Sequence, residues 1–194
     1  MLIDLTLTVA LRGADPVALT AAHALTHRLG FGGELAELAR RDLWRLRLEA
    51  SGVAEALALA GSWVTRSNVF VNPNKHVYEL AASRPGDKPG RASGRTAWIV
   101  AWSEPDIEGA AARNLIQTRF GARELAQVEK ALVWMLRFNA GIDADEIKRR
   151  AEEIAVARSR LSGLLTNPHF QSVAVVRAVD PRAAVVAAFG APAA

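Results

Sequence analysis

His23 and His27 are the side chains best placed for metal chemistry in this sequence of 194 residues. They lie four residues apart in a segment that is expected to be helical, and this spacing lets two imidazoles share one ion. A metal site also needs a third ligand, and the matching positions in the second half of the chain hold Asn114 and Thr118. We therefore interpret both histidines as exposed helix residues, and we predict no metal and no cofactor.

Thiol, acid–base and nucleotide chemistry are not indicated either. The sequence has no cysteine, so the chain itself cannot be a thiol glutaminase or hold a thiolate metal site. The neighbouring carboxylates at 143–145 and 152–153 fall in an expected helix, where such charges are typical of the first turn and the solvated face. No Gly-x-x-x-x-Gly-Lys-Ser/Thr loop occurs, and the glycines within residues 30–33 lack the spacing of a dinucleotide-binding loop.

The composition is that of a folded globular protein, since 51% of the residues are hydrophobic and 23% are charged. The net charge of +4, with a pI near 10.1, raises nucleic acid as a partner. However, 24 basic residues against 20 acidic ones is a mild excess, and we do not expect nucleic-acid binding. The N-terminus shows no signal peptide, and no apolar run is long enough to span a bilayer, so we predict a cytoplasmic protein without a membrane partner.

A segment rich in glycine and proline, residues 82–95, divides the chain into two parts of similar size. It contains no large apolar residue, which is typical of a flexible linker. We predict a first unit over residues 1–81, a second unit over residues 96–180, and an alanine-rich tail over residues 181–194.

The second unit repeats the first, which indicates a tandem duplication. Trp44 and Trp134 occupy the same place in the two copies, where we expect core aromatics under the helices rather than a platform for stacking a ligand. Three pairs of segments match in the same order: 15–30 with 106–121, 43–50 with 133–140, and Asn72-Pro73 with Asn167-Pro168.

Each unit is predicted to be a βαββαβ arrangement. Residues 5–11 alternate at period two, as a half-buried strand does, and the following helix opens at an aspartate and stops at a glycine. The expected elements of the first unit are strand 5–11, helix 15–28, strands 34–39 and 43–49 joined by a hairpin turn, helix 52–67 and strand 75–81. Those of the second unit are strand 96–102, helix 106–119, strands 124–130 and 133–139 joined likewise, helix 143–165 and strand 170–178. The predicted fold class is α+β: two tandem ferredoxin-like (split βαβ) domains, each a four-stranded antiparallel sheet with both helices on one face.

Each half resembles the small subunit of phosphoribosylformylglycinamidine synthase, the PurS family of purine biosynthesis. The resemblance rests on the segment 11–16, in which Asp15-Pro16 opens the first helix, and on the Asn-Pro pairs Asn72-Pro73 and Asn167-Pro168 before the last strands. The chain departs from the family at the entry to the hairpin, where Arg40-Arg41-Asp42 stands in place of Arg-x-Gly-Lys.

This resemblance implies a subunit without catalytic residues that bridges the ATP-dependent synthetase and the glutaminase of a ligase complex. The candidate partner contacts are then Asp15, Pro16, Asn72, Pro73, Asn167 and Pro168. The Asn-Pro pairs also have a structural interpretation, because Asn favours turns and Pro ends helices. Two alternatives stay open: a small-molecule-binding regulatory module with its ligand between the two copies, and an RNA-binding protein, which only the pI suggests.

The two predicted sheets differ in the face that the helices leave uncovered. In the first half this face carries Thr6, Thr8, Arg45, Arg47 and Glu79, which we expect water to solvate. In the second half, alternation places Trp98 and Val100 under the helices and leaves an apolar face, which usually marks an interface. We predict a homodimer through that face, the alternative cover being the tail at residues 183–189. The predicted contact residues are Ile99, Val133, Met135, Ala174 and Val176.

Overall fold

The computed structural model describes residues 1–82, 94–157, 163–177 and 182, and its six strands form one antiparallel sheet. In the order β3-β1-β2-β5-β4-β6, the strands are β3 (His76–Ala82), β1 (Leu2–Leu11), β2 (Leu35–Glu49), β5 (Leu125–Phe138), β4 (Thr96–Ser103) and β6 (Gln171–Val176). The helices are α1 (Pro16–His27), α2 (Val53–Ser67), α3 (Ile107–Phe120) and α4 (Ala144–Ala155), with a 3₁₀ turn at Phe31–Gly33. Within these residues, no helix combines the length and the apolar character that crossing a membrane requires.

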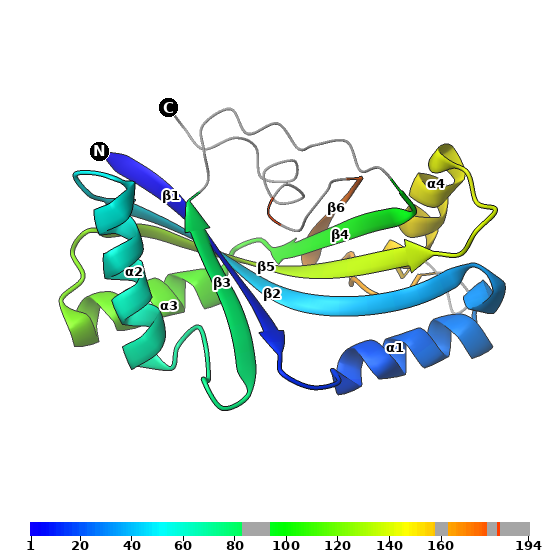
Figure 1. Ribbon diagram of the computed structural model, residues 1–194, viewed down its shortest axis with the longest axis horizontal. Coiled ribbons are helices and arrows are strands. Elements are labelled where there is room, and N and C mark those ends of the chain that lie inside the picture. Colours follow the sequence, from blue (N-terminus) through cyan, green and yellow to red (C-terminus); the bar gives the residue numbers. More distant parts are fainter. Residues whose placement is uncertain (83–93, 158–162, 178–181, 183–194) are drawn as a thin grey trace.

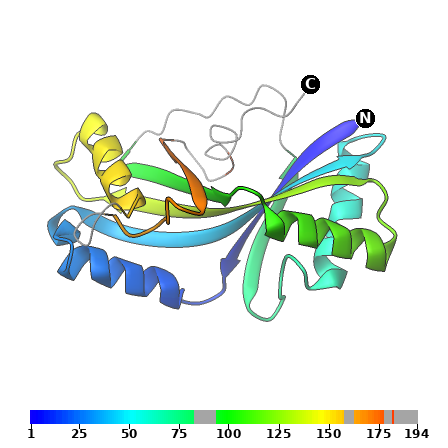
Figure 2. The same ribbon diagram turned by 180° about the vertical axis from the view of Figure 1, so that it is seen from behind.

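The α+β class is confirmed, but the prediction of two four-stranded sheets is wrong. Each predicted hairpin, over 34–49 and 124–139, is one continuous strand, β2 of 15 residues and β5 of 14 residues. The two strands pair with each other over almost their whole length and form the middle of the molecule, with α2 and α3 at one end and α1 and α4 at the other (Figures 1 and 2). The expected turns at 40–42 and 131–132 contain no Gly, Pro or Asn, so the local sequence does not force the chain to reverse.

The other helices and the last strand of each half lie within two residues of their predicted bounds, but α4 is shorter than predicted. It ends at Ala155, and Val156 forms a bridge with Thr166 instead of continuing the helix to residue 165. The buried Thr166 hydroxyl donates a hydrogen bond to the Ala155 carbonyl at 2.7 Å, which satisfies an acceptor that the helix end leaves open. The predicted linker and tail lie largely outside the described residues.

The two halves exchange their first helices. One core cluster combines β1, β2 and α2 of the first half with Ala112 and Ile116 of α3, which belongs to the second half. The other cluster combines β4, β5 and α4 of the second half with Ala18 and Leu25 of α1, which belongs to the first. Leu25 and Ile116 are both fully buried. Each half therefore completes the hydrophobic core of the other.

Both exchanged helices begin at an aspartate, as predicted. Asp15 Oδ1 accepts a hydrogen bond from the Val17 amide, and Asp106 Oδ1 accepts one from the Gly109 amide, both at 2.8 Å. The second carboxylate oxygen of Asp106 accepts from the Lys130 amide of β5 at 2.6 Å. The N-cap therefore also attaches the start of α3 to a central strand.

Gly109 lies so close to β5 that it has no room for a side chain. A Cβ at this position would lie 2.5 Å from the Val128 carbonyl oxygen and would also collide with the Asp106 carboxylate. We expect Gly109→Ala to lower the free energy of unfolding by about 2 kcal/mol, because backbone must move to admit the methyl group.

Gly61→Ala is the matched control for this prediction. Gly61 lies in α2 with open space around it, so the change is expected to raise stability by up to about 1 kcal/mol. Urea unfolding of both variants measures the two effects, and a Gly109→Ala protein as stable as the parent would contradict the close approach.

β4 presents the opposite faces from those that were predicted. Ile99 pairs with Trp134 and therefore lies on the helix-covered face, where it is fully buried. Val100 pairs with Val133, which places Val100 and its alternate neighbour Trp98 on the other face. The prediction of Ile99 as an interface residue, with Trp98 and Val100 under the helices, is therefore wrong.

A difference in loop length explains the reversed faces. Leu11 and Ser103 hold equivalent places at the ends of β1 and β4, since they pair with the first residues of β3 and β6. Three residues separate Leu11 from Asp15, but two separate Ser103 from Asp106. Aligning the halves on their aspartates thus shifts the strand by one residue, which moves every side chain to the wrong face.

Candidate functional site

The two halves meet at a pseudo-twofold axis near Asp42 of β2 and Leu132 of β5, which pair directly. The pairing is symmetric about this point, because Arg40 lies opposite Trp134 and Lys130 lies opposite Trp44. Arg40 and Lys130 are therefore equivalent positions, as are the two tryptophans. We call the strip around Asp42 on the helix-covered face the seam.

A charged side chain from the other half lies over the ring of each tryptophan at the seam. Trp44 and Trp134 are 7% and 4% exposed, which confirms their prediction as core aromatics. Lys130 Nζ lies 5.1 Å from the ring centroid of Trp44, and the guanidinium carbon of Arg40 lies 6.0 Å from that of Trp134. Ring faces attract cations, so these contacts join the halves across the axis.

The same two cations are paired with acids at the helix starts. Arg40 Nε lies 2.9 Å from Asp15 Oδ2, and Lys130 Nζ lies 2.6 Å from Glu108 Oε2. The Arg40 and Lys130 side chains are 26% and 22% exposed and Asp15 is 13% exposed, whereas Glu108 is 68% exposed. The charges of these residues are thus largely balanced within the protein.

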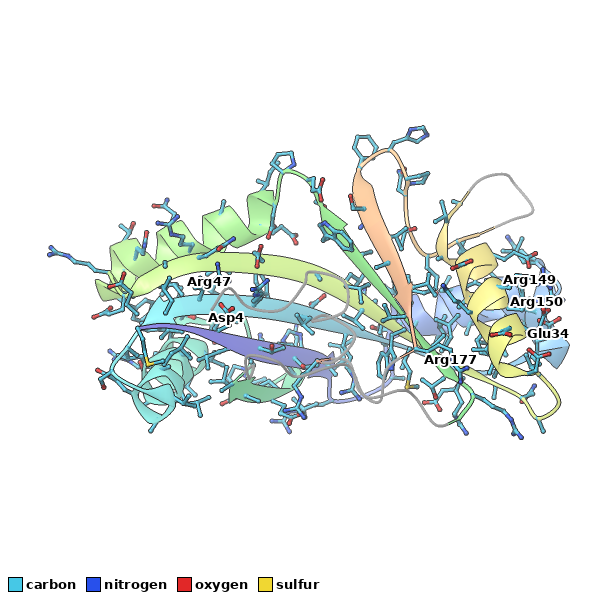
Figure 3. The ribbon with its side chains drawn as sticks, turned by 90° about the horizontal axis from the view of Figure 1, so that it is seen from above. Asp4, Glu34, Arg47, Arg149, Arg150 and Arg177 are labelled. Carbon is cyan, nitrogen blue, oxygen red and sulfur yellow. The ribbon has the colours of Figure 1, made fainter. Side chains whose placement is uncertain are left out.

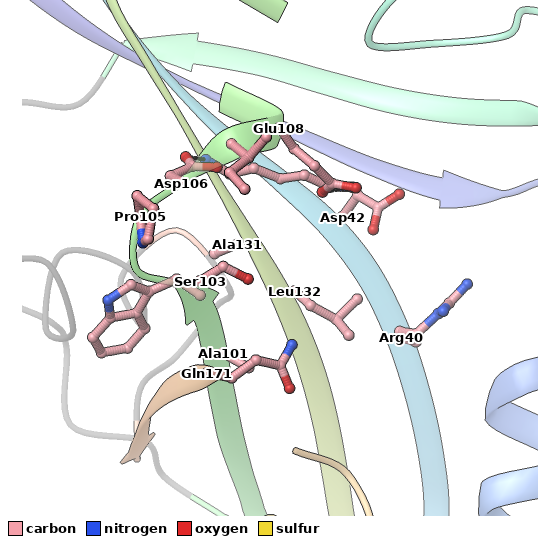
Figure 4. A pocket seen from close by; sticks show the side chains of 13 residues that line it. Arg40, Asp42, Ala101, Ser103, Pro105, Asp106, Glu108, Ala131, Leu132 and Gln171 are labelled. Carbon is pink, nitrogen blue, oxygen red and sulfur yellow. Dashed lines mark hydrogen bonds and ion pairs between the residues drawn. The ribbon is translucent and has the colours of Figure 1, made fainter. Parts of the chain in front are cut away.

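A cavity of about 430 Å³ opens on the second-half side of the seam, between the central strands, the end of β4 and the start of α3 (Figure 4). Apolar side chains such as Ala101, Leu132 and Ile107 form part of its wall. Within the described part of the chain, the Asp42 carboxylate in this wall has no hydrogen-bond or ion-pair partner. The other polar wall residues are Arg40, Ser103, Asp106, Glu108, Lys130 and Gln171.

The equivalent position in the first half is almost filled. The cavity there measures about 60 Å³ and is lined by Val9, Leu11, Asp15 and His76, with Arg40 and Asp42 shared between the two cavities. Only one of two symmetry-related places at the seam is therefore open.

The family-motif residues of the first half lie together beside the seam. Asp15 caps α1 and lines the small cavity, while Pro16 is the first residue of that helix. The loop with Asn72-Pro73 lies against the end of β1, where Arg12 Nε donates to the Pro73 carbonyl at 3.2 Å.

Both Asn-Pro pairs form the same turn, which supports their structural interpretation. The Asn72 side chain accepts from the Asn74 amide, and the Asn167 side chain accepts from the His169 amide, both at 3.0 Å. The backbone amide of each asparagine donates to the side chain of the first residue of the next strand. The Asn72 N–H donates to His76 Nδ1 at 3.1 Å, and the Asn167 N–H donates to Gln171 Oε1 at 3.0 Å. Pro73 and Pro168 are exposed and lie at opposite edges of the sheet.

The remaining predicted interface residues lie on the helix-free face, as expected. Val133 is 1% exposed within the single chain, whereas Met135, Ala174 and Val176 are half-buried. Val133 therefore needs no second chain to remove it from water. The homodimer stays a prediction, and light scattering of the purified chain tests it.

The helix-free face of the first half holds a largely buried charged cluster: its predicted solvation is wrong for Thr6 and Thr8, and Arg45 and Arg47 are half-buried rather than exposed. Thr6 and Thr8 are 3% and 4% exposed. Asp4, which the sequence analysis missed, accepts from Arg47 Nε at 2.8 Å (Figure 3). It also accepts from Arg45 Nη2 at 3.0 Å. The missed signal was that Asp4 alternates with Thr6 and Thr8 along β1 and therefore lies on the same face of the sheet. It pairs with Arg47 of β2. The exception is Glu79, which is 62% exposed and pairs with Arg182.

The charges in this cluster act on the pKa of Asp4. Burial would raise that pKa, but the hydrogen bonds and charges of Arg47 and Arg45 outweigh it. The pKa of this carboxyl therefore lies below its usual value of 3.8. Two guanidinium groups that are bound in this way are poorly placed to contact a nucleic-acid backbone.

His23 and His27 lie on the exposed side of α1, as predicted, with their ring centroids 4.4 Å apart. Among the residues that the structure describes, no group of three or more His, Cys, Asp or Glu side chains is arranged to hold a metal ion. A comparison with protein-family models and a search of curated proteins found no match to the chain.

Proposed function

We propose that the chain is a PurS-like bridging subunit that holds the synthetase and the glutaminase of a phosphoribosylformylglycinamidine synthase complex, in purine biosynthesis. In this proposal the chain contributes no catalytic residue. The single observation that supports it is the exchange of α1 and α3, since two proteins bound to different halves would be held by one continuous core.

The tandem ferredoxin-like origin of the fold belongs to the same proposal. The strands β3 and β1, the second part of β2 and the first part of β5 form a four-stranded segment covered by α2 and α3. The other segment consists of the first part of β2, the second part of β5, β4 and β6, covered by α1 and α4. Each segment has the strand arrangement of a split βαβ unit whose first helix and second strand come from the other copy. Opening two hairpins into β2 and β5 would convert two separate units into this shared sheet.

The two edges of the sheet offer chemically different surfaces for two partners. The turn that leads into β3 carries Lys75, with Arg12 beside it, and both are exposed, whereas β3 itself exposes Val77, Tyr78 and Glu79. The equivalent edge at β6 carries Phe170, which is 73% exposed, and Glu104. The basic turn before β3 and the apolar, acidic turn before β6 fit two different proteins better than two copies of one.

Co-purification of the chain with the synthetase and glutaminase subunits of the same organism tests this proposal. We expect one complex that contains all three proteins. Lys75→Glu should release one partner and Phe170→Asp the other, while Lys148→Glu on the exposed side of α4 should release neither. A chain that binds neither subunit would overturn the proposed function.

A further inference from the structure

We propose that the 430 Å³ cavity at the seam is a binding site for a small zwitterion, a free amino acid or a compound of similar size that carries both an ammonium and a carboxylate group. The inference goes beyond the bridging function and does not depend on the partner subunits. It rests on a comparison of two equivalent places in one molecule.

The cavity exists because small or flexible side chains replace larger ones at equivalent positions. Ala101 pairs with Leu132, and Val9 pairs with Asp42. Because Leu132 and Asp42 are equivalent positions, Ala101 stands where the first half has Val9. Ser103 likewise stands in place of Leu11. The same backbone arrangement therefore encloses about 60 Å³ in the first half and about 430 Å³ in the second.

The opened cavity contains polar groups that the protein itself leaves unused. Asp42 has no side-chain partner in the described part of the chain. Gln171 uses its Oε1 to accept from Asn167, so its amide nitrogen remains able to donate. Arg40 uses Nε for Asp15, which leaves the terminal guanidinium nitrogens available for a ligand.

The charge of these groups selects the ligand. The charges of Arg40 and Lys130 are already balanced by Asp15 and Glu108, whereas that of Asp42 is not. A carboxylate without a partner in a partly enclosed wall favours an ammonium group. The donors of Arg40 and Gln171 then suit the carboxylate of the same molecule, and the volume is within the range of small-molecule sites.

Ligand-observed NMR with the full-length chain tests the proposal, using the standard amino acids as probes. Each amino acid that binds is then compared with the amine that lacks its carboxylate and with the acid that lacks its ammonium group. We expect at least one amino acid to bind. The affinity of each of its two analogues should be lower by about tenfold or more. No binding by any amino acid at about 10 mM, or equal binding of the analogues, would overturn the proposal.

The first half supplies the variant that fills the cavity. Ala101→Val with Ser103→Leu introduces the residues of the equivalent positions, and we expect it to abolish binding. Asp42→Leu copies Leu132 and should weaken binding about tenfold through loss of the ammonium partner, even where the double variant does not fold. Asp145→Asn, at the exposed start of α4, is the matched control and should bind as the parent does. Binding that survives both seam variants would place the ligand elsewhere and refute the site.

Discussion

Residues 1–82 produced alone are expected to have no folded monomer, and the same holds for residues 94–194. The reason is the exchange of helices. Without the second half, Leu5 and Trp44 lose α3 and the strand β5, and with them the cover of the first core cluster. Without the first half, Trp134 and Ile99 lose α1 and β2. We expect this loss to exceed the roughly 5–15 kcal/mol by which a domain of ordinary stability is folded.

Circular dichroism and light scattering of the separate halves measure this effect. At micromolar concentration each half should be unfolded, or should fold only as an assembly with further copies of itself. Mixing the halves in equal amounts should restore a 1:1 complex with the cooperative unfolding of the intact chain. A chain cleaved at a protease site inserted at residue 88 is the control, and it should stay folded. A half that is a monomer with sharp unfolding would contradict the exchanged architecture.

Features that depend on local sequence could be predicted. Aspartate at the N-cap, the alternation of β1 and the Asn-Pro turns each act within a few residues, and the structure has them where the sequence indicated. Because these signals occur in both copies, the predicted bounds of α1, α2, α3, β3 and β6 lie within two residues of those in the structure.

The pairing of β2 with β5 could not be predicted in this way. A hairpin and a strand exchange bury the same alternating residues and differ only in whether the chain reverses near Asp42. That choice depends on contacts between distant residues, such as that of Arg40 with Trp134, which lie 94 residues apart in the sequence. Pattern and propensity do not contain this information.

The candidate site depends on that pairing and was missed for the same reason. Asp42 appeared in the sequence only as part of a departure from a family motif. The strand exchange places it at the axis between the halves, and the small residues Ala101 and Ser103 then leave space beside it. The reversed faces of β4 show the same limit, because the length of one loop decides them.

Asp4→Ala is expected to lower the free energy of unfolding by about 3 kcal/mol. It leaves Arg45 and Arg47, whose side chains are 12% and 22% exposed, without their main acceptor. The second half supplies the control, because Arg137 is the equivalent of Arg47 but pairs with Glu37 at the surface, where the two side chains are 56% and 45% exposed. Glu37→Ala should therefore cost less than about 1 kcal/mol. Equal losses in urea unfolding would show that the buried cluster contributes no more than a surface pair.

Lowering the pH should remove the contribution of Asp4 to the free energy of unfolding over a defined pH range. Because the pKa of this carboxyl is lower in the folded protein than in the unfolded chain, its stabilisation is complete above about pH 4 and is lost as the pH falls through the folded value. Asp4→Asn removes the charge with little change of shape, so its stability should lack this part of the pH dependence. The difference in unfolding free energy between the parent and Asp4→Asn should then be constant from about pH 7 to pH 5 and should shrink below about pH 4. The subtraction cancels the exposed carboxylates, including Glu55 and Glu146, whose pKa values are also lowered, since both proteins contain them. A difference that stays constant down to about pH 2.5 would mean that the pKa of Asp4 is the same in the folded protein and in the unfolded chain, so that Arg45 and Arg47 do not lower it.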